Sequence, residues 1–144
     1  QVGLKIAPTE DENLLDDICF VVNASRVVSE LVATNTRGGQ RFVRNGVDKI
    51  AFRPPGSNTV LYTGGQAGTP LHANAVWVAQ TARHFLDESV RIIGVGGIHD
   101  GATAFDFIKK DVSGIECATA HMTYGESIYS DIARDLLEHM PEAA

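Results

Sequence analysis

Hydrophobic positions recur along this chain with two periods, that of a strand and that of a helix. Short apolar runs predict strands, and between them apolar residues recur every three or four positions, which predicts helices. The predicted strands are Val2–Ala7, Glu30–Thr34, Val90–Val95 and Ser113–Ala118. The predicted helices are Glu10–Ala24, Pro70–Leu86, a third that runs from His99-Asp100-Gly101 to about Lys110, and Glu126–Met140. The pattern therefore predicts a strand followed by a helix, four times over.

The start of the first helix and the buried face of the last can also be predicted. Thr9 and Glu12 have the spacing of a capping box, in which Thr9 caps the helix and Glu12 bonds back to its start. In the last helix, Ile128, Ile132 and Leu136 share one face, which we expect to be buried.

Strands that alternate with helices predict right-handed βαβ units, a parallel sheet and the α/β class. Two architectures fit, a small doubly wound domain and a part of a (β/α)8 barrel, since four units are half of the eight in a complete barrel. We find no linker within residues 1–144 and expect a single domain, partial if it is a barrel. A long irregular loop covers about residues 35–69, within which Lys49–Phe52 and Thr59–Tyr62 are candidates for a small hairpin.

Charge and composition narrow the classes of function. The chain has 144 residues with 18 acidic and 12 basic side chains, and its net charge of −6 argues against a nucleic-acid partner. Its apolar runs are too short to span a membrane. Cys19 and Cys117 lack the spacing of a disulfide framework or a zinc site, so a reducing cytoplasm is the expected location. The five histidines form no paired ligand motif, and we expect no metal.

The strongest candidate site follows the third predicted strand. The run Ile92–Ile98 is apolar and contains Gly96-Gly97, and a helix begins soon after it. Paired glycines let backbone amides approach an anion closely, and the helix start adds partial positive charge. In barrels such a phosphate site is shared with the loop after the next strand, which here is Ala118-Thr119-Ala120. The alternative is that the glycine pair is only a tight turn.

Polar residues at the ends of the first two strands are further candidates. Thr34, Asn35 and Thr36 follow the second strand, and the Asn35 amide suits a planar ligand with both carbonyl and N–H groups. Asn35 could equally open the loop by bonding nearby backbone. Lys5 interrupts an apolar strand, and a buried lysine needs a ligand or a charge beside it. We favour this interpretation over the alternative, in which Lys5 lies at a sheet edge with its ammonium in solvent. The run Gly64–Pro70 is either a phosphate cradle or a hinge.

Three histidines and one cysteine have a less certain role. His72, His99 and His121 lie near the loops on the same predicted face, where each either contacts a ligand or is a partly exposed structural residue. Cys117 lies inside the fourth predicted strand, so we expect it in the core rather than as a nucleophile.

Taken in order, these motifs closely resemble the dihydroorotate dehydrogenase family along essentially the whole chain. The matching segments are Lys5-Ile6-Ala7-Pro8, Thr34-Asn35-Thr36, Gly64-Gly65-Gln66-Ala67-Gly68, Ile92–Ile98 and Ala118-Thr119-Ala120. Each motif is unspecific by itself, and five in order are specific together. Lys5–Pro8, Thr34–Thr36 and Gly68–Leu71 look most like the class 2, quinone-linked enzymes.

The resemblance implies an FMN-containing (β/α)8 barrel that oxidises dihydroorotate to orotate in pyrimidine synthesis. It matches this chain to the C-terminal half of that barrel, strands five to eight. It also implies a role for nine residues. Lys5 and Thr34 would contact the flavin, Asn35 and Thr36 the orotate ring, and Gly68, Gly96, Gly97, Ala118 and Thr119 the FMN phosphate and ribityl chain.

The chain departs from the family pattern at several positions. Ala118 stands where the family usually has Gly or Tyr, Gln66-Ala67 replaces Leu-Ser, and Thr69 stands where class 2 relatives are often basic. The family's catalytic base, a Cys or Ser, belongs to the N-terminal half. With Gln1 rather than Met first, we expect a fragment that is inactive alone.

A half-barrel exposes two sheet edges, so we expect a homodimer or pairing with a complementary half. Two other functions remain open. One is a different flavin barrel that acts on a related pyrimidine, similar to dihydropyrimidine dehydrogenase. The other is a non-catalytic half-barrel that binds phosphate or associates with itself.

Overall fold

The structure is a computed structural model that describes residues 2–40, 43–44, 47–48 and 64–140. Four strands form its central sheet: β1 (Val2–Ile6), β2 (Val28–Ala33), β7 (Arg91–Val95) and β8 (Gly114–Glu116). They lie in the order β1-β2-β7-β8, and every neighbouring pair is parallel. The predicted α/β class and parallel sheet are confirmed.

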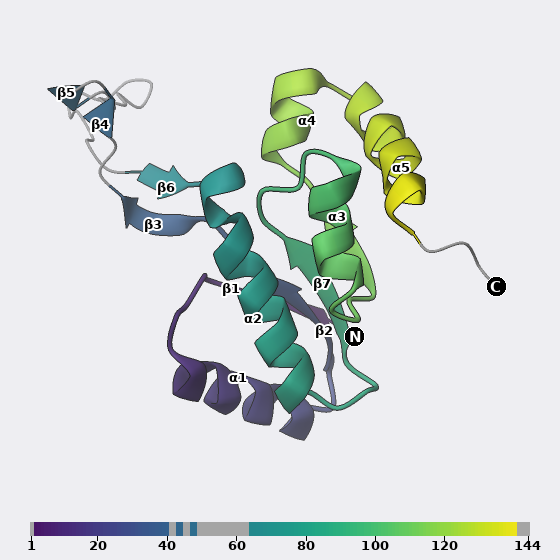
Figure 1. Cartoon of the computed structure of the whole chain (residues 1–144). Coiled ribbons are helices and arrows are strands. Elements are labelled where there is room, and N and C mark those ends of the chain that lie inside the picture. Colours follow the sequence, from purple (N-terminus) through teal and green to yellow (C-terminus); the bar gives the residue numbers. More distant parts are fainter. Residues whose placement is uncertain (1, 41–42, 45–46, 49–63, 141–144) are drawn as a thin grey trace.

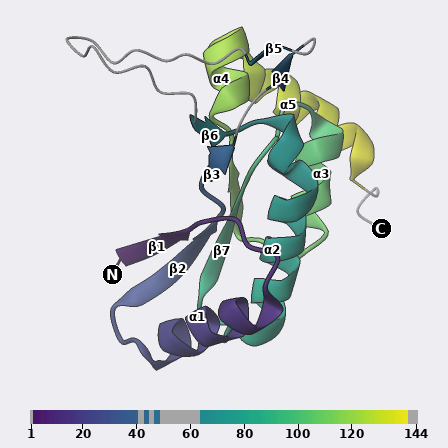
Figure 2. The same cartoon turned by 90° about the vertical axis from the view of Figure 1, so that its left-hand side faces the viewer.

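The helices between these strands show which of the two architectures is present. Helices α1 (Glu12–Ala24), α2 (His72–Phe85) and α3 (Gly101–Ile108) cover one face of the sheet (Figure 1, Figure 2). The last helix, α5 (Ser127–His139), packs against α3. A doubly wound sheet reverses its strand order at a switch point, whereas the order of the described strands follows the chain without reversal. Winding in one direction with helices on one face is the arrangement of a (β/α)8 barrel.

A buried apolar layer joins the sheet to its helices. Leu31 and Ile92 are neighbours in the register of β2 and β7, and both are fully buried. Phe107 of α3 lies directly on Gly94 of β7, because a Cβ at this glycine would overlap the aromatic ring. This close contact packs the last turn of α3 against β7, two residues before the glycine pair.

The predicted cap of the first helix is wrong. The helix begins at Glu12 rather than Glu10, so the N-cap residue is Asp11. Its carboxylate accepts hydrogen bonds from the backbone N–H groups of Asn13 at 3.0 Å and Leu14 at 3.2 Å. The Thr9 hydroxyl instead accepts from the Asp11 N–H at 3.0 Å. Aspartate and threonine are both good N-cap residues, so the position at which the helix begins determines which of them caps it. Here the helix begins two residues later than predicted, and the cap is Asp11.

Residues 35–69 are less irregular than predicted. Strands β3 (Arg37–Gln40) and β6 (Gly64–Gln66) pair antiparallel at the base of this segment, and the short strands β4 (Val43–Arg44) and β5 (Val47–Asp48) pair with each other. A 3-10 turn, η1 (Thr69–Leu71), leads into α2. The hairpin predicted from Lys49–Phe52 and Thr59–Tyr62 lies outside the described residues, as does Gln1.

The C-terminal part departs from the prediction in two places. The fourth strand ends at Glu116, so Cys117 and Ala118 follow it, and a short helix that was not predicted, α4 (Thr119–Tyr124), begins at Thr119. In α5, Ile128 and Ile132 are buried as predicted, whereas Leu136 is half-buried.

Candidate functional site

The carboxyl ends of the four parallel strands surround a cavity of about 260 Å³. In barrel proteins this end of the sheet carries the ligand sites. All nine residues to which the sequence assigned a binding role line this cavity: Lys5, Thr34, Asn35, Thr36, Gly68, Gly96, Gly97, Ala118 and Thr119. Segments more than a hundred residues apart in the chain therefore meet at one place.

Three glycines shape one wall of the cavity. Gly96, Gly97 and Gly68 have φ angles of +145°, +70° and +77°, a range that side chains larger than hydrogen rarely adopt. A Cβ on Gly97 would lie 2.8 Å from the Cβ of His72 and 3.0 Å from the Gly68 carbonyl oxygen. A Cβ on Gly68 would lie 3.1 Å from the Thr119 methyl group. This wall of the cavity is therefore backbone at three positions where a side chain would not fit.

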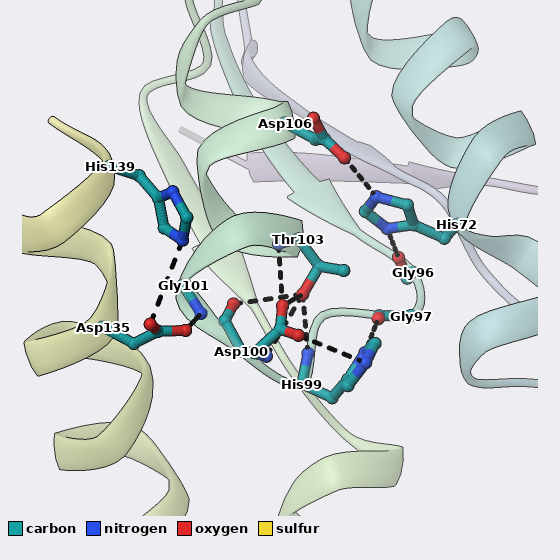
Figure 3. Close-up of polar contacts among 10 residues, drawn as sticks. All are labelled: His72, Gly96, Gly97, His99, Asp100, Gly101, Thr103, Asp106, Asp135 and His139. Atoms are coloured by element: carbon teal, nitrogen blue, oxygen red, sulfur yellow. Dashed lines mark hydrogen bonds and ion pairs between the residues drawn. The ribbon is translucent and has the colours of Figure 1, made fainter.

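Two histidines hold the carbonyl groups of this glycine turn (Figure 3). The Nδ1 atom of His72 lies 3.1 Å from the Gly96 oxygen, and the Nδ1 atom of His99 lies 2.7 Å from the Gly97 oxygen. The far ring nitrogen of His72 lies 3.0 Å from a carboxylate oxygen of Asp106 on α3. His99 lines the cavity, whereas His72 and His121 lie outside its lining. His72 thus has the structural role that the sequence left open.

The start of α3 is fixed next to this turn. Asp100 is its N-cap and accepts from the Thr103 N–H at 2.8 Å, while the Thr103 hydroxyl accepts from the Asp100 N–H at 3.1 Å. Partial burial raises the pKa of Asp100, but the hydrogen bonds from Thr103 outweigh it and leave the pKa below its usual value. The Gly101 N–H donates to Asp135 of α5 at 2.6 Å (Figure 3). This network keeps the turn between β7 and α3 in place.

The end of β2 is held by both neighbouring strands. Thr34 is 2% exposed, and both its N–H and its hydroxyl reach the Val95 oxygen, at 2.9 and 3.3 Å. The Asn35 N–H donates to the Ile6 oxygen at 2.8 Å. The Asn35 side-chain oxygen accepts from the Thr36 N–H at 2.9 Å, which is the local loop contact that the sequence offered as an alternative. Within the described ranges its amide nitrogen donates to no protein group.

Lys5 has a charged partner that the sequence did not predict. β1 is an edge strand, and the Lys5 ammonium lies 3.5 Å from a carboxylate oxygen of Glu116 on β8, with side chains 42% and 53% exposed. The pair spans the sheet from one outer strand to the other, across the cavity that both residues line. The sequence signal was present, because a lysine in an apolar strand needs a counter-charge and Glu116 is the charged residue of β8.

Neither cysteine is prepared to act as a nucleophile. Burial, with the negative charge of Asp16, raises the pKa of the Cys19 thiol to about 11. Burial also raises the pKa of Cys117, which is half-buried and lines the cavity directly after β8. Its expected position inside the strand is therefore wrong, and both thiols are protonated at neutral pH.

The fold defines a protein of (β/α)-barrel topology, with a cavity at the carboxyl ends of its strands. Comparison with known sequences gives the family. Residues 1–140 match the family described as Dihydroorotate dehydrogenase. This chain belongs to the dihydroorotate dehydrogenase family.

Curated relatives and solved structures agree with this assignment. The chain is 30% identical over 141 residues to dihydroorotate dehydrogenase (quinone) of Bartonella tribocorum, covering 98% of this chain and 36% of the relative. It is 28% identical over 138 residues to the protein of the same name from Cellvibrio japonicus, and this match covers 96% of this chain and 37% of the relative. The crystal structure of the Eimeria tenella enzyme with ferulenol superimposes with a TM-score of 0.72 at 25% identity, covering 95% of this chain and 33% of that one.

The chain thus spans about a third of the length of the relatives it matches. Among the described residues, no helix combines the length and apolar character needed to cross a bilayer.

Proposed function

We propose that this chain forms the FMN-binding and substrate-facing strand ends of a dihydroorotate dehydrogenase-type oxidoreductase. The observation that carries the proposal is the convergence of nine residues on one cavity, since the family resemblance assigns those same residues to flavin and orotate. FMN, when bound, would supply the acceptor for the hydride that leaves dihydroorotate.

The glycine wall supports binding of the FMN phosphate. A phosphate needs several N–H donors at short range, and only residues without a Cβ allow that approach at Gly68, Gly96 and Gly97. Thr119, whose side chain lies next to Gly68, adds a hydroxyl to the residues that line the cavity. Ala118 contributes only backbone there, which is sufficient for a contact made by an N–H group.

Asn35 and Thr36 suit the pyrimidine. The free Asn35 amide nitrogen can donate to a ring carbonyl, while its oxygen, already accepting from Thr36, retains a second lone pair for a ring N–H. Lys5 places a cation at the same cavity, where it would stabilise negative charge on a reduced flavin.

We further propose that the chain corresponds to strands five to eight of the barrel, belongs to the quinone-linked class, and requires the rest of the barrel for turnover. Four βα units are half of the eight in a barrel, and the chain covers about a third of its relatives' length, which supports a partial barrel. The names of these relatives and the motifs Lys5–Pro8 and Thr34–Thr36 support the quinone-linked class. The expected partner is a second copy or a complementary half. Both cysteines are free thiols, which is consistent with the reducing cytoplasm.

The test is binding of FMN compared with riboflavin, which lacks the phosphate. We expect the purified chain to bind FMN more tightly than riboflavin, measured by quenching of flavin fluorescence. Gly97→Ala should abolish that preference, because the added Cβ meets backbone at Gly68. Gly38→Ala is the matched control, since a Cβ at Gly38 meets nothing within 4 Å. Equal affinity for the two flavins, or none for either, would overturn the phosphate site.

A further inference from the structure

The ring of His72 bridges the glycine turn and α3. Its two nitrogens lie 3.1 Å from the Gly96 carbonyl oxygen and 3.0 Å from a carboxylate oxygen of Asp106 (Figure 3). Lys109 pairs with the other oxygen of that carboxylate at 2.7 Å. Hydrogen bonds from Lys109 and His72 hold the pKa of Asp106 below its usual value. The contact between His72 and Gly96 is therefore anchored on α3 through Asp106.

The same contact fixes the direction of a backbone donor. The Gly96–Gly97 peptide bond is trans, and in a planar trans peptide the C=O of one residue and the N–H of the next point in opposite directions. The Gly96 carbonyl points to His72, which lies outside the cavity lining, whereas Gly97 lines the cavity. The Gly97 N–H therefore faces the cavity, and it donates to no acceptor among the described residues.

We propose that His72 is a positioning residue for the phosphate site: its ring, anchored on Asp106, holds the Gly96–Gly97 peptide so that the Gly97 N–H faces the anion. This inference rests on the proposed function, because it concerns the same phosphate site.

His72 fits this role better than its neighbour His99. The side chain of His72 is only 16% exposed and its ring packs edge-on against Phe107, with centroids 5.6 Å apart. The His99 side chain is 40% exposed, and its far nitrogen lies 3.5 Å from Asp100.

The first experiment measures binding of sulfate by its competition with FMN at a single pH. His72→Asn retains a side-chain nitrogen two bonds beyond Cβ as a donor to Gly96, so its affinity for sulfate should stay near that of the wild type. His72→Phe should bind sulfate roughly tenfold more weakly, the effect of losing one hydrogen bond.

His84→Phe, at an exposed position on the same helix, is the matched control and should follow the wild type. Unchanged affinity in His72→Phe, or an equal loss in His72→Asn, would overturn the proposal.

The second experiment needs no ligand. In nitrogen-15 NMR of the free chain, the Gly97 amide signal should move in His72→Phe and stay near its wild-type position in His72→Asn. A Gly97 signal that does not respond to His72→Phe contradicts the role of His72 even if FMN binds. If the NMR result is as expected but neither FMN nor sulfate binds, the proposed function fails instead.

Discussion

At the scale of single residues, the site combines charges that largely cancel. Lys5 is the cation that a flavin or an anionic substrate would meet, yet Glu116 is already beside it. Ion pairs as exposed as this one contribute little to stability, so the effect of Glu116 belongs to ligand binding. Glu116 would lower the positive potential that Lys5 offers.

Removal of that carboxylate should strengthen binding. We expect Glu116→Gln to bind FMN about twofold to fivefold more tightly, the range set by exposed ion pairs. Fluorescence titration measures it, and the gain should shrink at high salt because the charges are exposed. Glu30→Gln is the control, because Glu30 pairs with Arg91 at 3.0 Å and does not line the cavity. Weaker binding by Glu116→Gln would mean that Glu116 itself contacts the ligand.

Histidine roles could not be predicted at this scale. The sequence placed His72 near the loops but offered no sign of its partners, since Asp106 lies 34 residues away on another helix. The conformation of Gly96 and Gly97 was easier to predict, because a glycine pair directly after a buried strand indicates a turn with positive φ angles. Glu116 was overlooked because its partner Lys5 lies at the opposite side of the sheet, which depends on how the sheet is assembled.

At the scale of elements, the contact of α3 with β7 depends on one missing side chain. A Cβ at Gly94 would overlap the ring of Phe107, which is fully buried. We expect Gly94→Ala to lower the free energy of unfolding by about 1–3 kcal/mol, as overpacking does. Urea unfolding measures the loss. Gly114→Ala is the comparison, because its Cβ would meet only the flexible end of Ile93 at 3.2 Å, and an equal loss there would contradict this account.

The cap of α3 should make stability depend on pH. The pKa of Asp100 is below its usual value when folded, so its charge stabilises the fold above the unfolded pKa, near 3.8, and this contribution is lost as the pH falls through the folded value. Asp100→Ala should cost about 1 kcal/mol at neutral pH through loss of the cap, and less in acid. Asp100→Asn keeps a capping oxygen and should lose little at neutral pH. Urea unfolding at pH 7 and pH 3 tests both, and an Asp100→Ala cost that is equal at the two values would be contrary evidence.

The elements that could be predicted differ physically from those that could not. Strands such as Arg91–Val95 and helices such as His72–Phe85 carry a hydrophobic period over enough residues to identify them. Helix Thr119–Tyr124 has six residues, too few for a period, and Gly64–Gln66 forms a strand despite two glycines because Arg37–Gln40 lies beside it. Tertiary contacts determine such elements.

At the scale of the whole molecule, the described sheet has two outer strands with exposed apolar surface. Val2 and Leu4 of β1 are 55% and 38% exposed. On the opposite side, a cavity of about 480 Å³ lies along β8 and the apolar face of α5, lined by Ile115, Ile132 and Leu136 among others. An outer strand with unpaired backbone groups and apolar side chains is a template for another strand. Further β-structure is therefore expected at both sides of this sheet.

Self-association of the isolated chain is the consequence that can be measured. We expect sedimentation to give a mass above the 15.5 kDa of one chain, increasing with concentration. Leu4→Lys should shift the equilibrium toward the monomer, because a charge on an outer strand opposes strand pairing. Phe20→Lys is the matched control, since Phe20 is 72% exposed but lies on the helix α1 rather than on a strand. If Phe20→Lys disperses the assembly and Leu4→Lys does not, the contact is made by the helical layer, and the outer strands are not where this sheet is completed.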